Sequence, residues 1–316
     1  MPLISLSSEF DHDAVVESML LTHRAILGLA VTMTEPPVFS CEKPVYRAAK
    51  EACWRLGFIQ TDAECVAKAW QVMAERQGGF EPADWPVEPA DFGFQPWPRQ
   101  EHFPPCPMRL GLYAVLPDAA WVARMARAGV PTVQLRFKSD DKRLIEQEIN
   151  AAVAAVQGSE CLLFINDHWQ TAIDAGAYGV HLGQEDIDNA DLGAIRAAGL
   201  RLGLSTHGYA EMLKTDALSP SYIAMGAVFQ TTLKRMSTVP QGTGRLKAYA
   251  RLLRDYPLVA IGGIDAQRLP QVLDSGVGAV AVVRALIEAK DPEVAAHELL
   301  KQVLSQALPQ ELVQTT

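Results

Sequence analysis

Residues 162–183 read LLFINDHWQTAIDAGAYGVHLG, and this stretch decides the fold. The apolar run over 162–167 predicts a strand that is buried on both faces. A helix is expected to begin near His168 and Trp169, and a second apolar strand is expected over 179–183. This order is typical of two parallel strands that are joined by a crossover helix.

The same unit repeats through residues 109–316. Eight such units in about 200 residues predict a (β/α)8 TIM barrel. A doubly wound open sheet is the alternative, and it is less favoured because no glycine fingerprint follows the first strand. Strands are expected at 110–116, 132–138, 162–167, 179–183, 201–205, 222–229, 258–264 and 279–283, and helices at 119–128, 144–156, 192–198, 246–256 and 267–274.

The first 108 residues follow a different pattern. Helical spacing of apolar residues over 13–33, 45–56 and 62–75 predicts a helical N-terminal segment at 1–79. Thr61 or Asp62 is the expected cap of the third helix. Residues 80–108 hold eight of the 20 prolines and several aromatic residues, which argues against a helix or a central strand. We expect them to form an extended strap that packs on the barrel domain at 109–316.

Composition narrows the classes of function. The chain has 316 residues, 49% of them apolar, and a formal net charge of −9, which argues against a general nucleic-acid binder. No apolar run approaches the roughly 20 residues of a membrane span. We expect no secretory leader, because the first thirty residues lack the basic start and apolar middle of one. The five cysteines include no C-x-x-C pair, so we expect reduced structural thiols in a cytoplasmic protein.

Charged residues gather where the expected strands end, and in a TIM barrel this rim is the active site. Arg136, Lys138 and Lys234 place cations there. Asp167 and Asp186 place carboxylates among them. Because Mg²⁺ commonly takes one or two carboxylates and completes its shell with phosphate oxygens and water, this set predicts a magnesium-bridged polyphosphate.

A second anion site is expected at the last two strands. The Gly262-Gly263 turn and the end of the strand at 279–283 match the usual phosphate pocket of such barrels. Structural alternatives remain for several residues. They are an ion pair between Asp167 and Arg136, Asp186 as a helix cap, Gly262-Gly263 as a plain tight turn, His181 as a hydrogen-bonded core residue, and His207 in a loop.

Six segments together resemble thiamine-phosphate synthase. The similarity extends over about residues 108–300 and does not include the N-terminal segment. Each motif alone is a weak signal, but the combination is specific. The segments are QLRFK at 134–138, FIND at 164–167, GVHLGQED at 179–186, LSTH at 204–207, 229–234 with its lysine, and AIGGI at 260–264.

The resemblance implies a transferase. This family joins 4-amino-2-methyl-5-hydroxymethylpyrimidine diphosphate to 4-methyl-5-(2-phosphoethyl)thiazole, giving thiamine phosphate and diphosphate. It implies Mg²⁺ as the cofactor, small molecules as the substrates, and no nucleic-acid or membrane partner. Matched by motif, Asp167 and Asp186 hold the metal; Arg136, Lys138, Asn166 and Lys234 hold the diphosphate; Gln134 and Ser205 line the pyrimidine and diphosphate site; Thr231, Gly263, Val283 and Arg284 hold the thiazole phosphate; and Arg136, Lys138, Ser205 and Lys234 form the catalytic set.

Two positions depart from the family pattern. Leu233 stands where a hydroxyl residue is usual, and Arg284 stands where serine is usual. Both belong to the thiazole-phosphate end. The polar segment 231–244 is the expected lid over the site.

Other functions stay open beside the synthase. One is a thiazole tautomerase-like barrel, and another is a non-catalytic barrel that binds thiazole phosphate. The complete set of cations and carboxylates favours the synthase. For residues 1–100 we favour an extension packed against the barrel, over an interaction module for another protein or a self-association element that makes a homo-oligomer.

Overall fold

The structure, a computed structural model, describes residues 10–31, 34–96, 99–231 and 239–307. It contains two compact units. Unit 1 comprises Met1–Arg99, Gly208–Leu218 and Arg251–Leu253. Unit 2 comprises Gln100–His207, Ser219–Ala250 and Arg254–Thr316. Among the described helices, none is long and apolar enough to cross a membrane.

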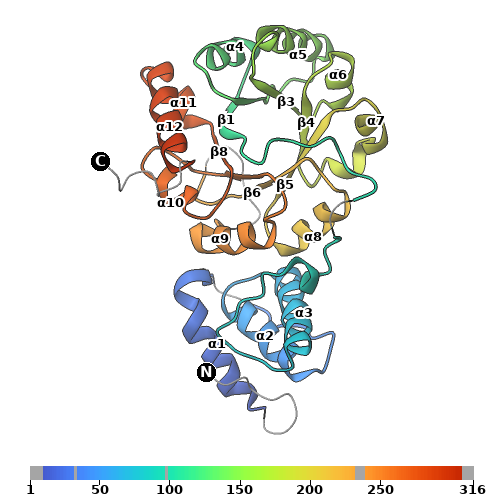
Figure 1. Cartoon of the computed structure of the whole chain (residues 1–316), viewed down its shortest axis with the longest axis vertical. Coiled ribbons are helices and arrows are strands. Elements are labelled where there is room, and N and C mark those ends of the chain that lie inside the picture. The colour runs from blue at the N-terminus through green and yellow to red at the C-terminus, as the bar shows by residue number, and fades with distance from the viewer. Residues whose placement is uncertain (1–9, 32–33, 97–98, 232–238, 308–316) are drawn as a thin grey trace, which may run out of the picture. The chain divides into compact units, whose positions relative to one another are not determined.

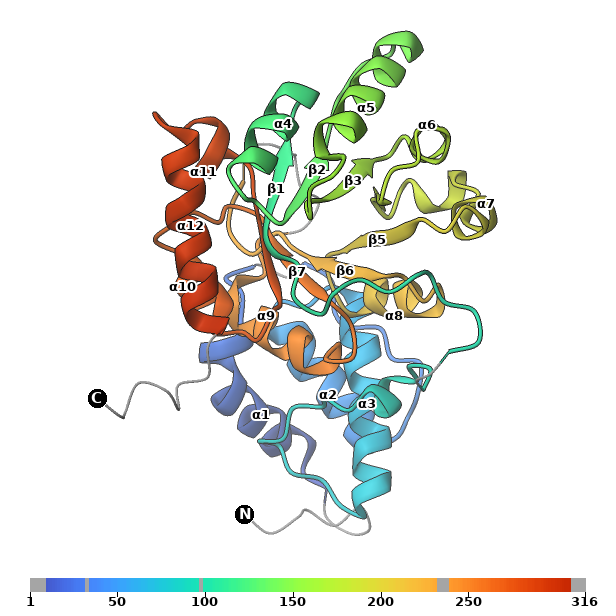
Figure 2. The same cartoon turned by 45° about the horizontal axis from the view of Figure 1, so that its top comes forward.

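Unit 2 is built around a closed barrel of parallel strands, surrounded by helices (Figures 1 and 2). Each strand pairs with the next, and β1 pairs with β8 to close the ring, so the predicted TIM barrel is confirmed. The strands are β1 (Gly111–Leu116), β2 (Thr132–Leu135), β3 (Leu162–Asn166), β4 (Gly179–Leu182), β5 (Arg201–Thr206), β6 (Tyr222–Met225), β7 (Leu258–Ile261) and β8 (Ala279–Val282).

Helices follow the strands in alternation along the chain. Most of them match the expected positions within a few residues. They are α4 (Ala119–Arg127), α5 (Lys142–Val156), α6 (Trp169–Asp174), α7 (Leu192–Ala197), α8 (Tyr209–Ala217), α9 (Gly242–Leu252), α10 (Leu269–Leu273), α11 (Arg284–Ile287) and α12 (Pro292–Ala307), with a 3₁₀ turn, η2 (Ile187–Asn189), after β4.

The expected strand at 222–229 is shorter than predicted. Regular pairing in β6 ends at Met225, although the backbone N–H groups of Val228 and Phe229 still donate to the carbonyls of Ile261 and Gly262 at 2.9 Å. The chain therefore stays beside the end of β7, but in an irregular conformation that an apolar pattern does not distinguish from a strand.

Two glycines make room for large aromatic residues inside the barrel. Phe164 of β3 lies opposite Gly179 of β4, and Tyr222 of β6 lies opposite Gly203 of β5. A Cβ atom at Gly203 would lie 2.0 Å from the Tyr222 ring, and one at Gly179 would lie 2.6 Å from the Phe164 ring. The two rings pack edge to face, with centroids 5.0 Å apart, in the interior of the barrel.

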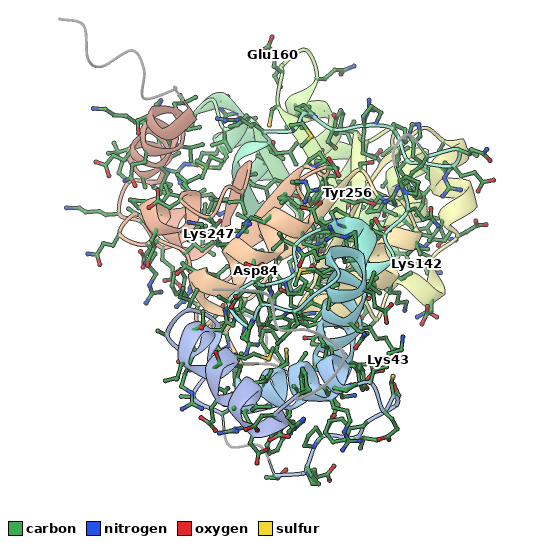
Figure 3. The ribbon with its side chains drawn as sticks, turned by 60° about the horizontal axis from the view of Figure 1, so that its bottom comes forward. Lys43, Asp84, Lys142, Glu160, Lys247 and Tyr256 are labelled. Atoms are coloured by element: carbon green, nitrogen blue, oxygen red, sulfur yellow. The ribbon has the colours of Figure 1, made fainter. Side chains whose placement is uncertain are left out.

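Unit 1 begins with three helices, α1 (His12–Leu27), α2 (Pro44–Arg55) and α3 (Gln60–Gln77). The expected first helix is shorter at its C-terminal end, because the chain becomes extended at Gly28. Lys43, labelled in Figure 3, precedes α2, and its Nζ lies 2.6 Å from Oε1 of Glu75 in α3. This exposed ion pair joins the start of one helix to the end of the next.

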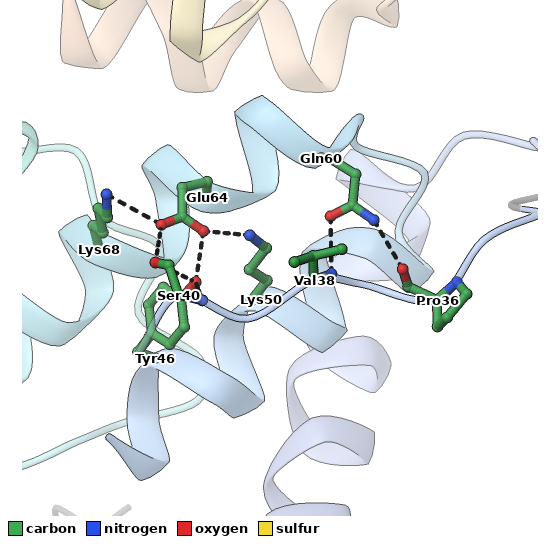
Figure 4. A network of polar contacts seen from close by, with 8 residues as sticks. All are labelled: Pro36, Val38, Ser40, Tyr46, Lys50, Gln60, Glu64 and Lys68. Carbon is green, nitrogen blue, oxygen red and sulfur yellow. Dashed lines mark hydrogen bonds and ion pairs between the residues drawn. The ribbon is translucent and has the colours of Figure 1, made fainter. Parts of the chain in front are cut away.

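A half-buried glutamate organises the polar contacts between α2 and α3 (Figure 4). Glu64 accepts hydrogen bonds from Ser40 Oγ and Tyr46 Oη, each at 2.5 Å, and pairs with Lys50 and Lys68. Although burial raises the pKa of Glu64, the hydrogen bonds from Lys50, Ser40 and Tyr46 outweigh it and lower that pKa to about 2. The carboxylate is therefore ionised at neutral pH.

The prediction that Thr61 or Asp62 caps α3 is wrong, because the cap position is Ile59. The helix begins at Gln60, so Asp62 lies in its first turn, where it is buried. Its Oδ1 accepts a hydrogen bond from the backbone N–H of Ala210 at 2.9 Å, in the first turn of α8. A Cβ at Gly208 would lie 2.0 Å from Asp62 Oδ2, so glycine is the residue that fits there. Asp62 thus accepts a hydrogen bond from a backbone N–H in the first turn of α8 that has no partner within the helix. Helix α8 also belongs to unit 1.

The other end of α8 is held by a buried ion pair. Arg99 and Asp216 are both almost fully buried. The guanidinium donates to the Asp216 carboxylate and to the Asp216 carbonyl. The backbone N–H of Gln95 donates to the same carboxylate at 3.2 Å. Residues of the N-terminal part of unit 1 therefore contact α8 at both of its ends.

The first half of the proline-rich strap contacts α8, a helix within 109–316 as expected, and also the N-terminal helices. Residues 80–99 and α8 are both part of unit 1, and the strap includes a 3₁₀ turn, η1 (Pro89–Phe92). Trp85 stacks on Phe58 with centroids 5.7 Å apart and donates to Tyr209 Oη at 2.9 Å. The aromatic residues explain this packing, because their large apolar surfaces gain most from burial.

The second half of the strap belongs to unit 2. Phe103 donates its N–H to the Ser219 carbonyl at 3.1 Å, and Ser221 donates to the Pro104 carbonyl at 2.6 Å. Cys106 is buried in the cluster of side chains that fills the barrel interior. The domain boundaries drawn from the sequence, at 79/80 and 108/109, stay a prediction.

Candidate active site

A cavity of 630 Å³ is formed by the carboxyl ends of the barrel strands and the loops that follow them. All residues of the predicted site that the structure describes line this cavity. The roles of these residues in binding stay predictions. Lys234 lies outside the described residues, as do Leu233 and much of the predicted lid. The residues that line the cavity include Gln134, Arg136, Lys138, Asn166, Asp167, Asp186, Ser205, Thr231, Gly263, Val283 and Arg284.

One end of the cavity combines lysine with carboxylates. Lys138 Nζ lies 2.5 Å from Asp167 Oδ2, so the ion partner of Asp167 is Lys138 rather than Arg136. Asp186 Oδ2 accepts the backbone N–H of Gly183 at 3.2 Å and does not cap η2 through its side chain. Burial, and then the nearby charge of Asp167, raise the pKa of Asp186.

These two carboxylates fit a divalent cation. They are close enough to repel each other, and a cation between them would relieve that repulsion. Among the described residues, no group of three or more histidine, cysteine or acidic side chains could hold a metal ion. Two carboxylates with open positions for phosphate oxygens and water are the set that Mg²⁺ takes in phosphate-binding sites.

The other end of the cavity is formed by the Gly262-Gly263 turn. Both glycines have positive φ, 109° and 64°. A Cβ at Gly262 would lie 2.6 Å from Ala227 Cα, and one at Gly263 would lie 2.5 Å from the Gln230 carbonyl oxygen. Arg268 donates to the Gly263 carbonyl at 2.6 Å and also lines the cavity, as does Arg284. This end therefore combines a close backbone turn with two guanidinium groups, which suits a phosphate.

A continuous chain of hydrogen bonds lies at the bottom of the cavity, and we call it the interior hydrogen-bond chain. Successive donor–acceptor distances along it are 2.9, 2.7, 2.7, 3.0 and 2.7 Å. Its members, in order, are Ser205, His181, Tyr222, Tyr113, Gln134 and Asn166. The first and last of them, together with Gln134, belong to the predicted site.

His181 is a hydrogen-bonded core residue, as the structural alternative predicted. It is 8% exposed, its Nδ1 contacts Tyr222 Oη, and its Nε2 contacts Ser205 Oγ. Burial lowers the pKa of His181 to about 4, so the imidazole is neutral at pH 7. It also lines the cavity, and so does His207.

Sequence reasoning missed three residues that support the site. Tyr113 and Tyr222 lie in apolar strands and read as ordinary core residues, because their hydroxyl partners come from other strands. Arg268 follows the Gly262-Gly263 turn by five residues. Its position in the turn after a glycine pair is a weak signal that could have drawn attention to it.

The chain is similar to known proteins over the barrel region. The family described as thiamine monophosphate synthase matches residues 112–286. A thiamine-phosphate synthase of Neisseria gonorrhoeae is 56% identical over 191 residues, which cover 60% of this chain and 93% of the relative. One of Serratia proteamaculans is 51% identical over 199 residues, covering 63% and 94%.

The barrel is also similar to a solved structure. The thiamine phosphate pyrophosphorylase from Pyrococcus furiosus is 28% identical, with a TM-score of 0.56, over 62% of this chain and 96% of that one. The match of the family covers more than half of the chain, and it contains nearly the whole barrel from β1 to β8. The chain therefore belongs to the thiamine monophosphate synthase family.

Proposed function

We propose that this chain is a transferase that joins 4-amino-2-methyl-5-hydroxymethylpyrimidine diphosphate to 4-methyl-5-(2-phosphoethyl)thiazole, giving thiamine phosphate and diphosphate. The observation that carries the proposal is a cavity lined by two different sets of charged and backbone groups. A lysine and two carboxylates lie at one end, and a glycine turn with two arginines lies at the other. The two substrates carry a diphosphate and a monophosphate, respectively.

Bond breaking comes first in this proposal. The carbon–oxygen bond of the pyrimidine diphosphate breaks, and its electron pair leaves with the diphosphate. The 4-amino group donates electrons into the ring and stabilises the pyrimidine carbocation. Negative charge increases on the leaving group, so the cations of Arg136 and Lys138 stabilise the transition state more than the ground state. Asn166 adds a hydrogen-bond donor, and Lys234 a further cation, at the diphosphate.

Asp167 and Asp186 would hold Mg²⁺, with diphosphate oxygens and water completing its shell. When bound, the ion supplies positive charge that offsets the charge on the departing diphosphate. Lys138 pairs with Asp167 in the structure. In the complex its ammonium would lie beside both the carboxylate and the diphosphate, and so keep the leaving group in place.

Bond formation follows at the other end of the cavity. The Gly263 backbone, Thr231 and the Val283-Arg284 segment would hold the thiazole phosphate. The ring nitrogen then attacks the carbocation with its own lone pair, so no general base is required. The site must also exclude water, since water would capture the same cation.

Diphosphate release by the purified chain tests the proposal. Release should require Mg²⁺ and both substrates, and thiamine phosphate should form in equal amount. Asp167→Asn and Asp186→Asn should each lower the rate on the order of 10²-fold, because the charge stabilisation of the leaving group is lost.

Glu160→Gln is a matched control. Glu160, labelled in Figure 3, is exposed and precedes β3, at the opposite end of the strand from Asp167. Its substitution should leave the rate unchanged. Binding of the thiazole phosphate without any diphosphate release would contradict the synthase and favour a tautomerase-like or binding role.

A further inference from the structure

The interior hydrogen-bond chain has a direction, and Gln134 sets it. Gln134 Nε2 donates to Asn166 Oδ1 at 2.7 Å, and Gln134 Oε1 accepts from Tyr113 Oη at 3.0 Å. A primary amide has one nitrogen that donates and one oxygen that accepts. The single hydroxyl hydrogen of Tyr113 is therefore used in the bond to Gln134.

The next two contacts follow from this. Tyr113 and Tyr222 hydroxyls lie 2.7 Å apart, and Tyr113 has no second hydrogen to give. Tyr222 must therefore donate to Tyr113. Its hydroxyl hydrogen is then used as well, so Tyr222 can only accept from His181 Nδ1, which lies 2.7 Å away. The proton of His181 is thus placed on Nδ1.

The last contact reaches the cavity. Neither ring nitrogen of His181 has a carboxylate as its hydrogen-bond partner, and the ring is buried, so it stays neutral. In a neutral imidazole with its proton on Nδ1, Nε2 is an acceptor. Ser205 Oγ, 2.9 Å away, therefore donates its hydrogen to His181.

Both ends of the interior hydrogen-bond chain then present a fixed polarity to the ligand. The hydroxyl hydrogen of Ser205 is used in the protein, so Ser205 offers lone pairs to the cavity. The carbonyl oxygen of Asn166 is taken by Gln134, so Asn166 offers its Nδ2 hydrogens. One end accepts a hydrogen bond and the other end donates one.

We propose that Tyr113, Tyr222 and His181 are positioning residues that fix Ser205 as a hydrogen-bond acceptor and thereby select an amino-substituted pyrimidine. This inference rests on the proposed function for the identity of the ligand. The exocyclic amino group carries the only N–H donors of the fully ionised pyrimidine diphosphate, and the diphosphate oxygens are acceptors that suit Asn166. A 4-oxo pyrimidine would place a carbonyl oxygen against the Ser205 lone pairs.

The same contact supports the chemistry. An amino group that donates to Ser205 Oγ has its N–H bonds polarised towards the oxygen, which increases the electron density that the nitrogen gives to the ring. This donation stabilises the carbocation formed as the diphosphate leaves. Gly203 is part of the arrangement, because any larger residue there would displace the Tyr222 ring.

Nitrogen NMR of histidine measures the direction of the chain in the protein without any ligand. With ¹⁵N-histidine, the shifts distinguish a protonated from an unprotonated ring nitrogen, and the His181 signals are those absent from a His181→Gln variant. The wild type should carry the proton on Nδ1. Tyr113→Phe frees the Tyr222 hydrogen to donate to Nδ1, and Tyr222→Phe removes the acceptor at Nδ1. Both variants should therefore move the proton to Nε2.

Tyr178→Phe is the matched control, because Tyr178 precedes β4 and contacts Phe164 without joining the chain. It should leave the His181 tautomer unchanged. A wild-type ring protonated on Nε2, or on both nitrogens at neutral pH, overturns the proposal. So does an unchanged tautomer in both folded Phe variants. Should a variant fail to fold, the wild-type spectrum by itself still establishes which ring nitrogen carries the proton.

Ligand discrimination measures the consequence. The probes are the 4-amino and 4-oxo pyrimidines with a diphosphate whose scissile oxygen is replaced by CH₂, and calorimetry with Mg²⁺ gives the two dissociation constants. The wild type should bind the amino compound about tenfold more tightly or better, since an unmatched polar contact is costly. Tyr113→Phe and Tyr222→Phe should bring the ratio close to one, and Tyr178→Phe should preserve it.

The proposed selection of the amino group is overturned if the wild type binds the 4-amino and 4-oxo compounds with similar dissociation constants. It is also overturned if the ratio of these constants is unchanged in both Phe variants. Failure of the proposed function is distinguishable from either result. It would appear in the diphosphate-release assay of the wild type, whereas the NMR measurement uses no substrate at all.

Discussion

Glu64 is a single residue whose charge state should control the acid stability of unit 1. Its pKa in the folded chain is about 2, against an ordinary value of 4.5. A lowered pKa means that the folded state favours the carboxylate, so its stabilisation is present above pH 4.5 and is lost as pH falls towards 2. We predict that the unfolding midpoint of wild type and of Glu64→Gln differs at pH 7 and converges between pH 4.5 and pH 2.

Urea unfolding at several pH values measures this difference. Glu160→Gln, a substitution of an exposed glutamate, should instead follow the wild type at every pH. If the difference in unfolding midpoint between wild type and Glu64→Gln stays constant from pH 7 to pH 2, the stabilisation by the hydrogen bonds of Glu64 does not depend on its charge.

Gly203 is a second residue with a sharp expectation. A Cβ there would lie 2.0 Å from the Tyr222 ring, so Gly203→Ala must displace a buried tyrosine. We expect a loss of about 1–3 kcal/mol in the free energy of unfolding, as for other overpacked cores. In a Tyr222→Leu background the smaller side chain leaves space, and the same substitution should cost less. Equal costs in both backgrounds would place the clash elsewhere.

At the scale of elements, α8 should depend on the ion pair at its C-terminal end. Arg99→Leu leaves the buried Asp216 carboxylate without this cation, and we expect it to cost about 3–5 kcal/mol. The double variant Arg99→Leu/Asp216→Leu removes both charges and should recover much of that loss. Thermal unfolding of the three proteins measures it, and a double variant no better than the single one would contradict this reasoning.

The barrel elements were predictable because parallel strands that are buried on both faces form continuous apolar runs. Helix ends were less predictable, since tertiary contacts decide them. Asp62 has the sequence features of a cap for its own helix. In the structure it accepts a hydrogen bond from a backbone N–H of α8, which lies far away in the sequence. The contact of the strap with the N-terminal helices was missed for a similar reason, because the stacking of Trp85 on Phe58 is a tertiary contact.

At the scale of the whole molecule, the barrel topology brought the predicted site together without any long-range information in the sequence. Residues at the ends of parallel strands must meet at one rim, so Arg136, Asn166 and Ser205 could be grouped from their positions alone. The interior hydrogen-bond chain could not be predicted, because the partners of Tyr113 and Tyr222 depend on which strands face each other across the barrel.

The extent of unit 1 gives the last prediction. Unit 1 includes α8 as well as residues 1–99. Three residues of the N-terminal part contact α8: Asp62 contacts Ala210, Trp85 contacts Tyr209, and Arg99 contacts Asp216. A chain that begins at residue 100 keeps the buried aromatic and acidic side chains of α8 but loses these partners. We therefore expect it to be less soluble and to unfold at a lower temperature. A chain that begins at residue 10 keeps every described contact and should match the full chain. An unchanged unfolding temperature after removal of residues 1–99 would instead show that α8 is stable without the N-terminal helices.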